Sequence, residues 1–285
     1  MERHPDPPPI ASVMQRVDAV ADGAPPPDSV TTGFPSLDKI LGGGLRRGDL
    51  VVVGGDVASG KSALALAVAL RAAQVEQATA LYTGEMSVER VLERALAIEG
   101  RARIDDLRRG TLPEETRAGV GAAAVRLRDH APLVQRIPAG RVDALGDAVR
   151  GAGELELVVV DSLQALARGR WPLDEELAAA MQRLKGLAVE LDVALLVTAQ
   201  LPRLERDRKD LRPQLADFGA LGAVAQHADV ILALFREEMY QPQGPGVEGA
   251  TELLVLKNRN GATGYVDLYF YTQWMRFEDM LDPDR

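Results

Sequence analysis

Short apolar runs recur along the chain between residues 50 and 270, and polar or glycine-containing segments separate them. Runs of this length that are rich in Val, Leu and Ile are typical of buried strands. We predict strands at Leu50–Val53, Thr79–Thr83, Leu155–Val160, Val193–Thr198, Val230–Phe235, Leu253–Leu256 and Tyr265–Phe270.

Between the earlier runs, apolar residues recur every three to four positions, which is the period of a helix. We predict helices at Ser62–Val75, Val88–Ile98, Glu114–Arg128, Val142–Arg150 and Asp174–Leu191. Strands that alternate with helices predict an α/β fold with a mainly parallel central sheet and helices on both faces. The final strands follow each other closely, so we expect an antiparallel C-terminal edge.

Residues 1–30 differ from the rest because proline triplets stand at 7–9 and at 25–27. Proline-rich segments are extended and bury no core of their own. Between the triplets, residues 10–21 predict a short amphipathic linker helix, whose apolar face is formed by Ile10, Val13, Met14, Val17 and Val20. This helix either folds back on its own domain or, as we favour, docks on a neighbouring subunit. We assign residues 31–285 to one globular domain.

The composition of the chain excludes several classes of function. The net charge of −9 excludes a broad basic surface for nucleic acid, although local basic loops remain compatible with it. There is no cysteine, which excludes disulfides and cysteine zinc sites and suits a reducing cytoplasm. No apolar run is long enough to span a bilayer, so we expect a cytoplasmic protein without a membrane partner.

The strongest motif is a phosphate-binding loop, G-x-x-x-x-G-K-[ST], between the first predicted strand and the first predicted helix. It consists of Gly55, Asp56, Val57, Ala58, Ser59, Gly60, Lys61 and Ser62. Its backbone N–H groups would surround the α- and β-phosphates, and Lys61 would reach the β- and γ-phosphates. Ser62 would donate its hydroxyl oxygen to Mg²⁺. The loop predicts binding of ATP or a related nucleotide.

Three polar residues stand at the ends of other predicted strands. Asp161 ends an apolar strand, where a carboxylate supports Mg²⁺ opposite the loop serine. Glu85 follows the second strand and could activate the attacking water, or it could be an acid that favours the start of the next helix. Gln200 ends another strand and could sense the γ-phosphate, or it could be an ordinary strand-end amide.

Two basic segments are candidate functional sites on weaker sequence evidence than the phosphate loop. Lys257 and Arg259 alternate before an Asn-Gly turn; they could stabilise charge on a γ-phosphate, but spacing alone favours a solvated hairpin. A loop after Gln200 mixes basic and acidic residues, so DNA contact and a solvated loop explain it about equally well. Its cations are Arg203, Arg206, Arg208, Lys209 and Arg212.

Taken together, these motifs resemble the C-terminal RecA-like motor domain of DnaB-type replicative helicases, within the superfamily of RecA-, RadA- and KaiC-like ATPases. The resemblance covers about 250 residues in the order expected of that family. Its segments are Thr32–Phe34, Gly42–Leu45, Gly60–Ser62, Gly84–Ser87, Leu107–Gly110, Val160–Asp161, Leu163–Gln164, Ala199–Leu201, Ala228–Ile231, Arg259–Gly261 and Arg276–Glu278.

The resemblance implies a hexameric ring that hydrolyses ATP with Mg²⁺ between subunits and translocates on single-stranded DNA in replication. It implies that Glu85 is the base and Gln200 the γ-phosphate sensor. It also implies that Lys257 and Arg259 enter the neighbour's site, and that the helix at 10–21 packs on an adjacent protomer.

The chain departs from the family pattern in three places. The family carries an Arg-Glu pair in its DNA loop where this chain has Gly219 and Ala220, and commonly a tyrosine where it has Ser162. We also expect no N-terminal helical domain before the linker, so a separate chain could supply one. These departures leave two alternative functions open. One is an ATP-driven switch or remodeller without unwinding activity, and the other is a subunit whose ATP site only holds a ring together.

Overall fold

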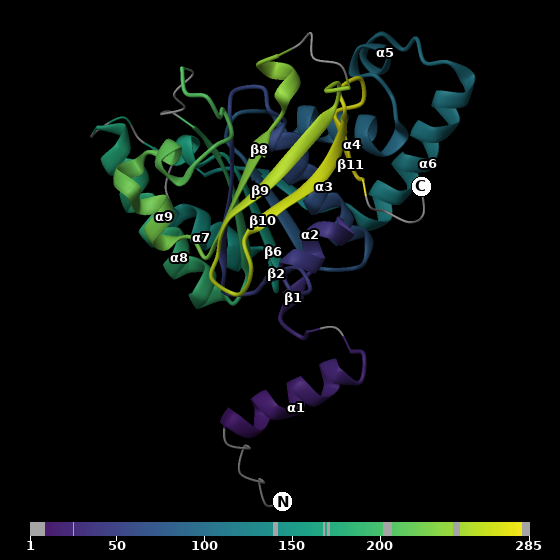
Figure 1. The fold of residues 1–285 in the computed structure, drawn as a ribbon. Helices are drawn as coiled ribbons and strands as arrows, with labels where there is room; N and C mark the ends of the chain where they lie inside the picture. Colours follow the sequence, from purple (N-terminus) through teal and green to yellow (C-terminus); the bar gives the residue numbers. More distant parts are fainter. Residues whose placement is uncertain are drawn as a thin grey trace, which may run out of the picture.

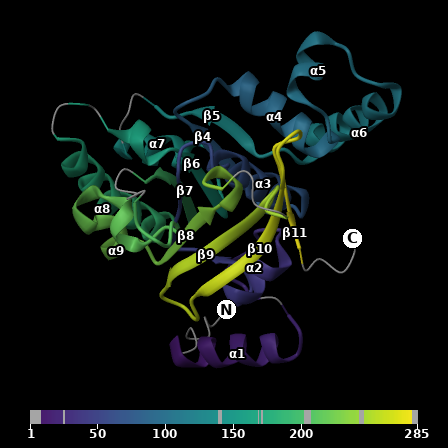
Figure 2. The same ribbon diagram turned by 45° about the horizontal axis from the view of Figure 1, so that its top comes forward.

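The computed structural model describes residues 9–24, 26–138, 142–167, 169, 172–201, 207–241 and 246–280. From residue 29 onwards, these residues form a layered α/β domain around a central sheet (Figure 1). Helix α1 (Pro9–Ala21) stands apart from this domain in the views of Figures 1 and 2. Within the described residues, no helix is both long and apolar enough to cross a membrane.

The central sheet has nine strands in the order β11-β10-β9-β8-β3-β7-β6-β4-β5. The six strands from β8 to β5 are parallel, and β9, β10 and β11 continue the sheet in antiparallel pairing. Their bounds are β3 Leu50–Gly55, β4 Thr79–Thr83, β5 Leu133–Arg136, β6 Leu157–Asp161, β7 Ala194–Gln200, β8 Val230–Phe235, β9 Ala250–Asn258, β10 Gly264–Tyr271 and β11 Arg276–Asp279. The carboxyl ends of the parallel strands therefore meet at one edge, where ligands of such sheets bind.

Helices cover both faces of the sheet (Figure 2). One apolar cluster joins the sheet to α2, α3 and α4, and a second joins it to α7, α8 and α9. Val51 and Val53 of β3 belong to the first cluster, whereas Leu50 and Val52 belong to the second. Successive side chains of a strand point to opposite faces, so a strand covered on both sides must be apolar throughout. The helix bounds are α2 Pro35–Ile40, α3 Lys61–Gln74, α4 Val88–Gly100, α5 Ile104–Arg109, α6 Glu114–His130, α7 Val142–Gly151, α8 Leu173–Leu191 and α9 Ala223–His227.

The domain begins with a small two-stranded sheet that is separate from the central one. Strands β1 (Ser29–Val30) and β2 (Leu45–Arg46) pair antiparallel, and the side chain of Val30 is fully buried. Before them, the apolar side chains of α1 remain exposed, and Ile10 and Val17 are 67% and 53% accessible. The described part of the domain therefore leaves this stripe uncovered rather than packing against it.

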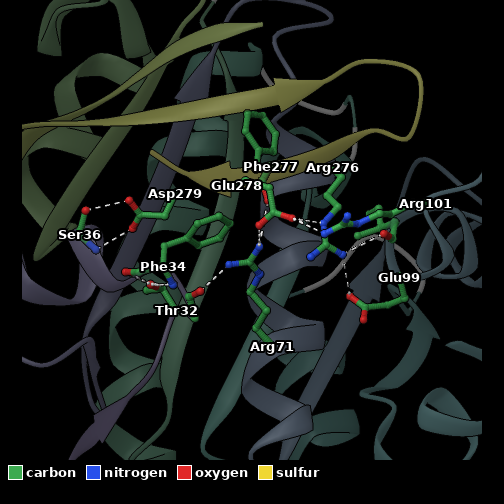
Figure 3. A network of polar contacts seen from close by, with 12 residues as sticks. Thr32, Phe34, Ser36, Arg71, Glu99, Arg101, Arg276, Phe277, Glu278 and Asp279 are labelled. Atoms are coloured by element: carbon green, nitrogen blue, oxygen red, sulfur yellow. Dashed lines mark hydrogen bonds and ion pairs between the residues drawn. The ribbon is translucent and has the colours of Figure 1, made fainter. Parts of the chain in front are cut away.

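Strand β11 fixes the far end of the helix that follows the phosphate loop. Arg71, in the last turn of α3, donates to the carbonyl oxygens of Gly33 and Phe277 and forms an ion pair with Glu278 (Figure 3). Glu278 also binds Arg276, so one carboxylate lies between two guanidinium groups. The ring of Phe277 lies against Gly60 of the phosphate loop, which links β11 directly to the candidate site.

The predicted α/β class is confirmed, with its parallel sheet, its helices on both faces and its antiparallel C-terminal edge. All seven predicted strands and all five predicted domain helices are present, with boundaries that differ by a few residues. Helix α1 also matches the predicted linker helix. Sequence periodicity missed β5, β11 and the short helices α2, α5 and α9, which offer too few apolar positions to establish a period.

Candidate nucleotide site

The phosphate loop joins β3 to α3 at the carboxyl edge of the sheet. Gly60, with a φ of 102°, lies immediately before the first residue of α3, so the positive end of the helix faces the loop. Lys61 Nζ donates to the carbonyl oxygens of Gly55 and Asp56 at 3.0 and 2.8 Å, which folds its ammonium group back over the loop. Burial lowers the pKa of Lys61, while nearby Asp161, Asp56 and Glu85 oppose that change.

The loop has the donors that a polyphosphate requires. Ser59 Oγ is a buried polar atom without a hydrogen-bond partner among the described residues. A buried hydroxyl is costly without a partner, so it suits a site that an anion completes. The residues of this loop therefore fit a bound nucleoside triphosphate.

Carboxylate and hydroxyl oxygens, which are the ligands that Mg²⁺ prefers, lie beside the phosphate loop. Asp161 Oδ1 accepts hydrogen bonds from Ser62 Oγ at 3.0 Å and from Thr198 Oγ1 at 2.6 Å, and the residue is 3% accessible. Burial raises the pKa of Asp161, and the two hydroxyl donors partly offset this. Among the described residues, no cluster of three carboxylate, His or Cys groups could hold a metal alone. One carboxylate and one hydroxyl suit Mg²⁺ that is otherwise coordinated by substrate phosphates and water.

Glu85 and Gln200 line the same cavity of about 570 Å³ as Lys61, Ser62 and Asp161. Ser162 Oγ donates to Glu85 Oε1 at 2.6 Å. The backbone N–H of Gln200 donates to Gln164 Oε1 at 3.3 Å, so the end of β7 is tied to the turn that follows β6. The sequence-predicted residues from four different segments therefore meet around one space.

Two arginines that sequence reasoning missed also line this cavity. Arg94 of α4 lies near enough to Asp161 to oppose the rise of that residue's pKa. Arg236 directly follows β8, donates to the carbonyl oxygen of Ala58 at 3.3 Å and stacks over the ring of Phe270 at 4.5 Å. The positions of these arginines were the available sequence signal: Arg236 directly follows β8, which is adjacent to β3, and Arg94 lies two turns into the helix after Glu85.

Lys257 and Arg259 do not line the cavity of their own chain. Asn258, between them, pairs with Val230 at the amino end of β8, whereas Gly55 of the loop pairs with Leu234 near the carboxyl end. The two cations therefore lie at the opposite edge of the sheet from the loop, which is the edge where the amino ends of the parallel strands meet.

Both cations are held in place at that edge. Arg259 forms an ion pair with Asp229 at 2.8 Å, and its side chain is 53% accessible. Lys257 Nζ donates to the carbonyl oxygens of Ala225 and Ala228 at 2.8 and 2.5 Å. Burial is the first cause that lowers the pKa of Lys257, and the charge of Arg259 adds to it. Asp229 thus fixes an exposed guanidinium group on the outer surface of the domain.

The predicted DNA-contacting cations are less available than their sequence suggests. Arg208 pairs with Asp217 at 2.8 Å, and Arg212 pairs with Glu252 at 2.5 Å. Lys209 is exposed, and Arg203 and Arg206 lie outside the described residues. Much of the positive charge in the described part of this loop is therefore neutralised within the chain.

The positions of the missing Arg-Glu pair form a tight turn. Gly219 and Ala220 have φ values of 65° and 50°, and the N–H of Ala220 donates to Asp174 Oδ1 at 3.0 Å. Leu221, next along the chain, is 65% accessible. This turn presents an apolar side chain to solvent and no cation of its own.

A phosphate loop after β3, a carboxylate at the end of β6, two strands away in the same parallel sheet, and helices on both faces define a RecA-like P-loop nucleotide-binding domain. The family described as "DnaB-like helicase C terminal domain" matches residues 29–279. The chain belongs to this family.

Curated relatives agree with this assignment. The replicative DNA helicase DnaC of Bacillus subtilis (strain 168) is 29% identical over 258 residues, which cover 88% of this chain and 56% of the relative. The replicative DNA helicase DnaB of Leifsonia xyli subsp. xyli is 32% identical with the same coverage. The chain therefore spans just over half the length of these relatives.

Solved structures show the same fold. One of them, an ATPase domain, superposes with a TM-score of 0.87 at 22% identity, covering 97% of this chain and 100% of that domain. A DnaB-like replicative helicase, solved in a study of its interactions with primase, gives a TM-score of 0.85 at 24% identity and covers 94% of this chain and 65% of that one.

Proposed function

We propose that this chain is the motor domain of a ring-forming DNA helicase, which hydrolyses ATP between subunits and moves along single-stranded DNA in replication. One observation carries the proposal: Lys61, Asp161 and Glu85 line one cavity, whereas Lys257 and Arg259 lie at the opposite edge of the sheet. A complete site then requires two copies of the chain, as in ATPases with an arginine finger supplied in trans.

Each residue at the cavity has a distinct task in this reaction. Lys61 and the backbone of the loop hold the β- and γ-phosphates, and Glu85 accepts a proton from the attacking water. Gln200 donates its side-chain amide to the γ-phosphate. Ser62, and Asp161 through water, would hold Mg²⁺, which would supply positive charge to offset that of the phosphates. The neighbour's Arg259 stabilises the charge that develops as the γ-phosphate leaves.

Assembly also explains the uncovered linker helix. Helix α1 exposes one apolar stripe and stands away from its own domain, so we propose that it packs on the adjacent subunit of a hexamer. A buried apolar stripe of this kind stabilises a subunit contact without any change in the domain itself. We place this assembly in the cytoplasm.

The proposal is tested by DNA-stimulated ATP hydrolysis, measured at low salt together with light scattering. Phosphate contacts are strongest at low salt, so single-stranded DNA should raise turnover there, and a forked duplex should unwind. The expected mass is that of a hexamer. ATP hydrolysis without stimulation or unwinding would refute the helicase assignment and leave an ATPase.

A second candidate, an ATP-driven switch or remodeller on the same fold, is favoured by one observation. The turn at Gly219 and Ala220 carries no cation, and Arg208 and Arg212 are paired within the chain. If this candidate is correct, single-stranded DNA will not alter hydrolysis at any salt concentration. A protein partner will be required to stimulate turnover instead.

A further inference from the structure

The hydroxyl of Ser162 lies against the carboxylate of Glu85, with Oγ 2.6 Å from Oε1. Ser162 is 2% accessible, whereas Glu85 is exposed at the mouth of the cavity. We propose that Ser162 is the positioning residue of Glu85: it fixes the carboxylate so that one oxygen faces the attacking water. This inference rests on the proposed role of Glu85 as the base.

The two residues meet because their strands are neighbours. Thr83 at the end of β4 pairs with Asp161 at the end of β6, and the N–H of Gly84 donates to the carbonyl oxygen of Asp161 at 2.6 Å. A Cβ at Gly84 would lie 2.1 Å from Cβ of Ala165, so only glycine allows this close approach. The backbone therefore places Glu85 two residues beyond the end of the β4–β6 ladder and directly beside Ser162.

The hydrogen bond from Ser162 restricts the rotamers of the Glu85 side chain, which the backbone position of Glu85 alone does not do. A glutamate side chain has several rotatable bonds, and an exposed one samples many rotamers. Ser162 has one hydroxyl proton, and it is donated to Oε1. That bond fixes one oxygen of Glu85 and leaves Oε2 to accept the proton of the water. General-base catalysis depends on such geometry, because a displacement of about 1 Å can lower the rate about 100-fold.

The same turn also reaches the γ-phosphate sensor. Gln164, two residues after Ser162, accepts the backbone N–H of Gln200 through Oε1 at 3.3 Å. The segment from Ser162 to Gln164 therefore contacts both the candidate base and the strand end that carries the sensor. This turn therefore connects Glu85 to the end of β7 through two hydrogen bonds.

The test compares three variants of Ser162 in the full chain, assayed with ATP and Mg²⁺. Ser162→Ala removes the hydroxyl, Ser162→Cys keeps the volume but is a weak donor, and Ser162→Thr keeps the hydroxyl. We expect kcat to fall about tenfold in the Ala and Cys variants, since part of the base's contribution of about 100- to 10,000-fold depends on its orientation. The KM for ATP should stay unchanged, and the Thr variant should retain most of the activity.

Glu85→Gln and the double variant separate the possible results. If Ser162 acts only through Glu85, Ser162→Ala will cause no further loss when Glu85 is already glutamine. Wild-type kcat in Ser162→Ala, a rise in KM that matches the fall in kcat, or an equal additional loss in the double variant would each overturn the positioning role. Full turnover in Glu85→Gln would overturn the base assignment and the positioning role with it. Thermal unfolding and nucleotide affinity confirm that each variant is folded.

Discussion

Arg71 offers a quantitative test of how β11 supports the phosphate loop. Its guanidinium group bonds the carbonyl oxygens of Gly33 and Phe277 and the carboxylate of Glu278, and it lies 4.0 Å from the ring centre of Phe34 (Figure 3). The side chain is 18% accessible, so little water can replace these bonds. Arg71→Met keeps much of the packing but removes every donor.

The expected cost follows from the acceptors that lose a partner. Each partly buried acceptor without a donor costs about 1 kcal/mol, at the low end of the usual range. With Gly33, Phe277 and Glu278 affected, the free energy of unfolding should fall by about 3 kcal/mol, less a fraction that methionine packing returns. Urea unfolding followed by circular dichroism measures this change.

An exposed ion pair supplies the control. Arg183 of α8 pairs with Asp143 at 3.2 Å, and their side chains are 58% and 61% accessible. Surface pairs contribute about 0–1 kcal/mol, so Arg183→Met should change stability much less than Arg71→Met. Equal effects of the two substitutions, or a loss under about 1 kcal/mol for Arg71→Met, would contradict the role assigned to the β11 network.

Three further predictions concern the site and its assembly. Gly60→Ala should abolish nucleotide binding in a filter assay, because φ is 102° and the new Cβ would lie 2.8 Å from the ring of Phe277; retained affinity would contradict this. Thr198→Val should raise the Mg²⁺ concentration for half-maximal hydrolysis about tenfold, since Asp161 loses a buried donor; an unchanged Mg²⁺ titration would refute it. Val17→Asp should reduce the mass measured by light scattering without a change in domain stability, and an unaltered mass would count against docking of α1.

Much of the fold followed from local patterns. Buried parallel strands such as β3 are apolar throughout, and the phosphate loop has a fixed spacing, so both could be identified from residues adjacent in the chain. Strand β5 could not, because its four residues are mostly exposed at the sheet edge and show no apolar run.

The candidate site was only partly predictable for a different reason. Glu85, Asp161 and Gln200 stand at strand ends, where sheet topology alone brings them together. Ser162 and Arg236 act through contacts between separate segments, which depend on register and side-chain direction. The ring of Phe277 reaches Gly60 only because β11 adds to the sheet beside β10, a pairing without a local sequence signal.

If one nucleotide site is built from two subunits, variants that each lack a different half of the site should complement each other when they are mixed. Lys61→Ala removes the phosphate-binding cation, whereas Arg259→Ala removes the cation at the opposite edge of the sheet. Each variant alone should hydrolyse ATP at least about 1,000-fold more slowly than the wild type. Mixed rings contain some interfaces with an intact Lys61 on one side and an intact Arg259 on the other, so mixing should restore part of the activity. No recovery at any mixing ratio would contradict the shared site.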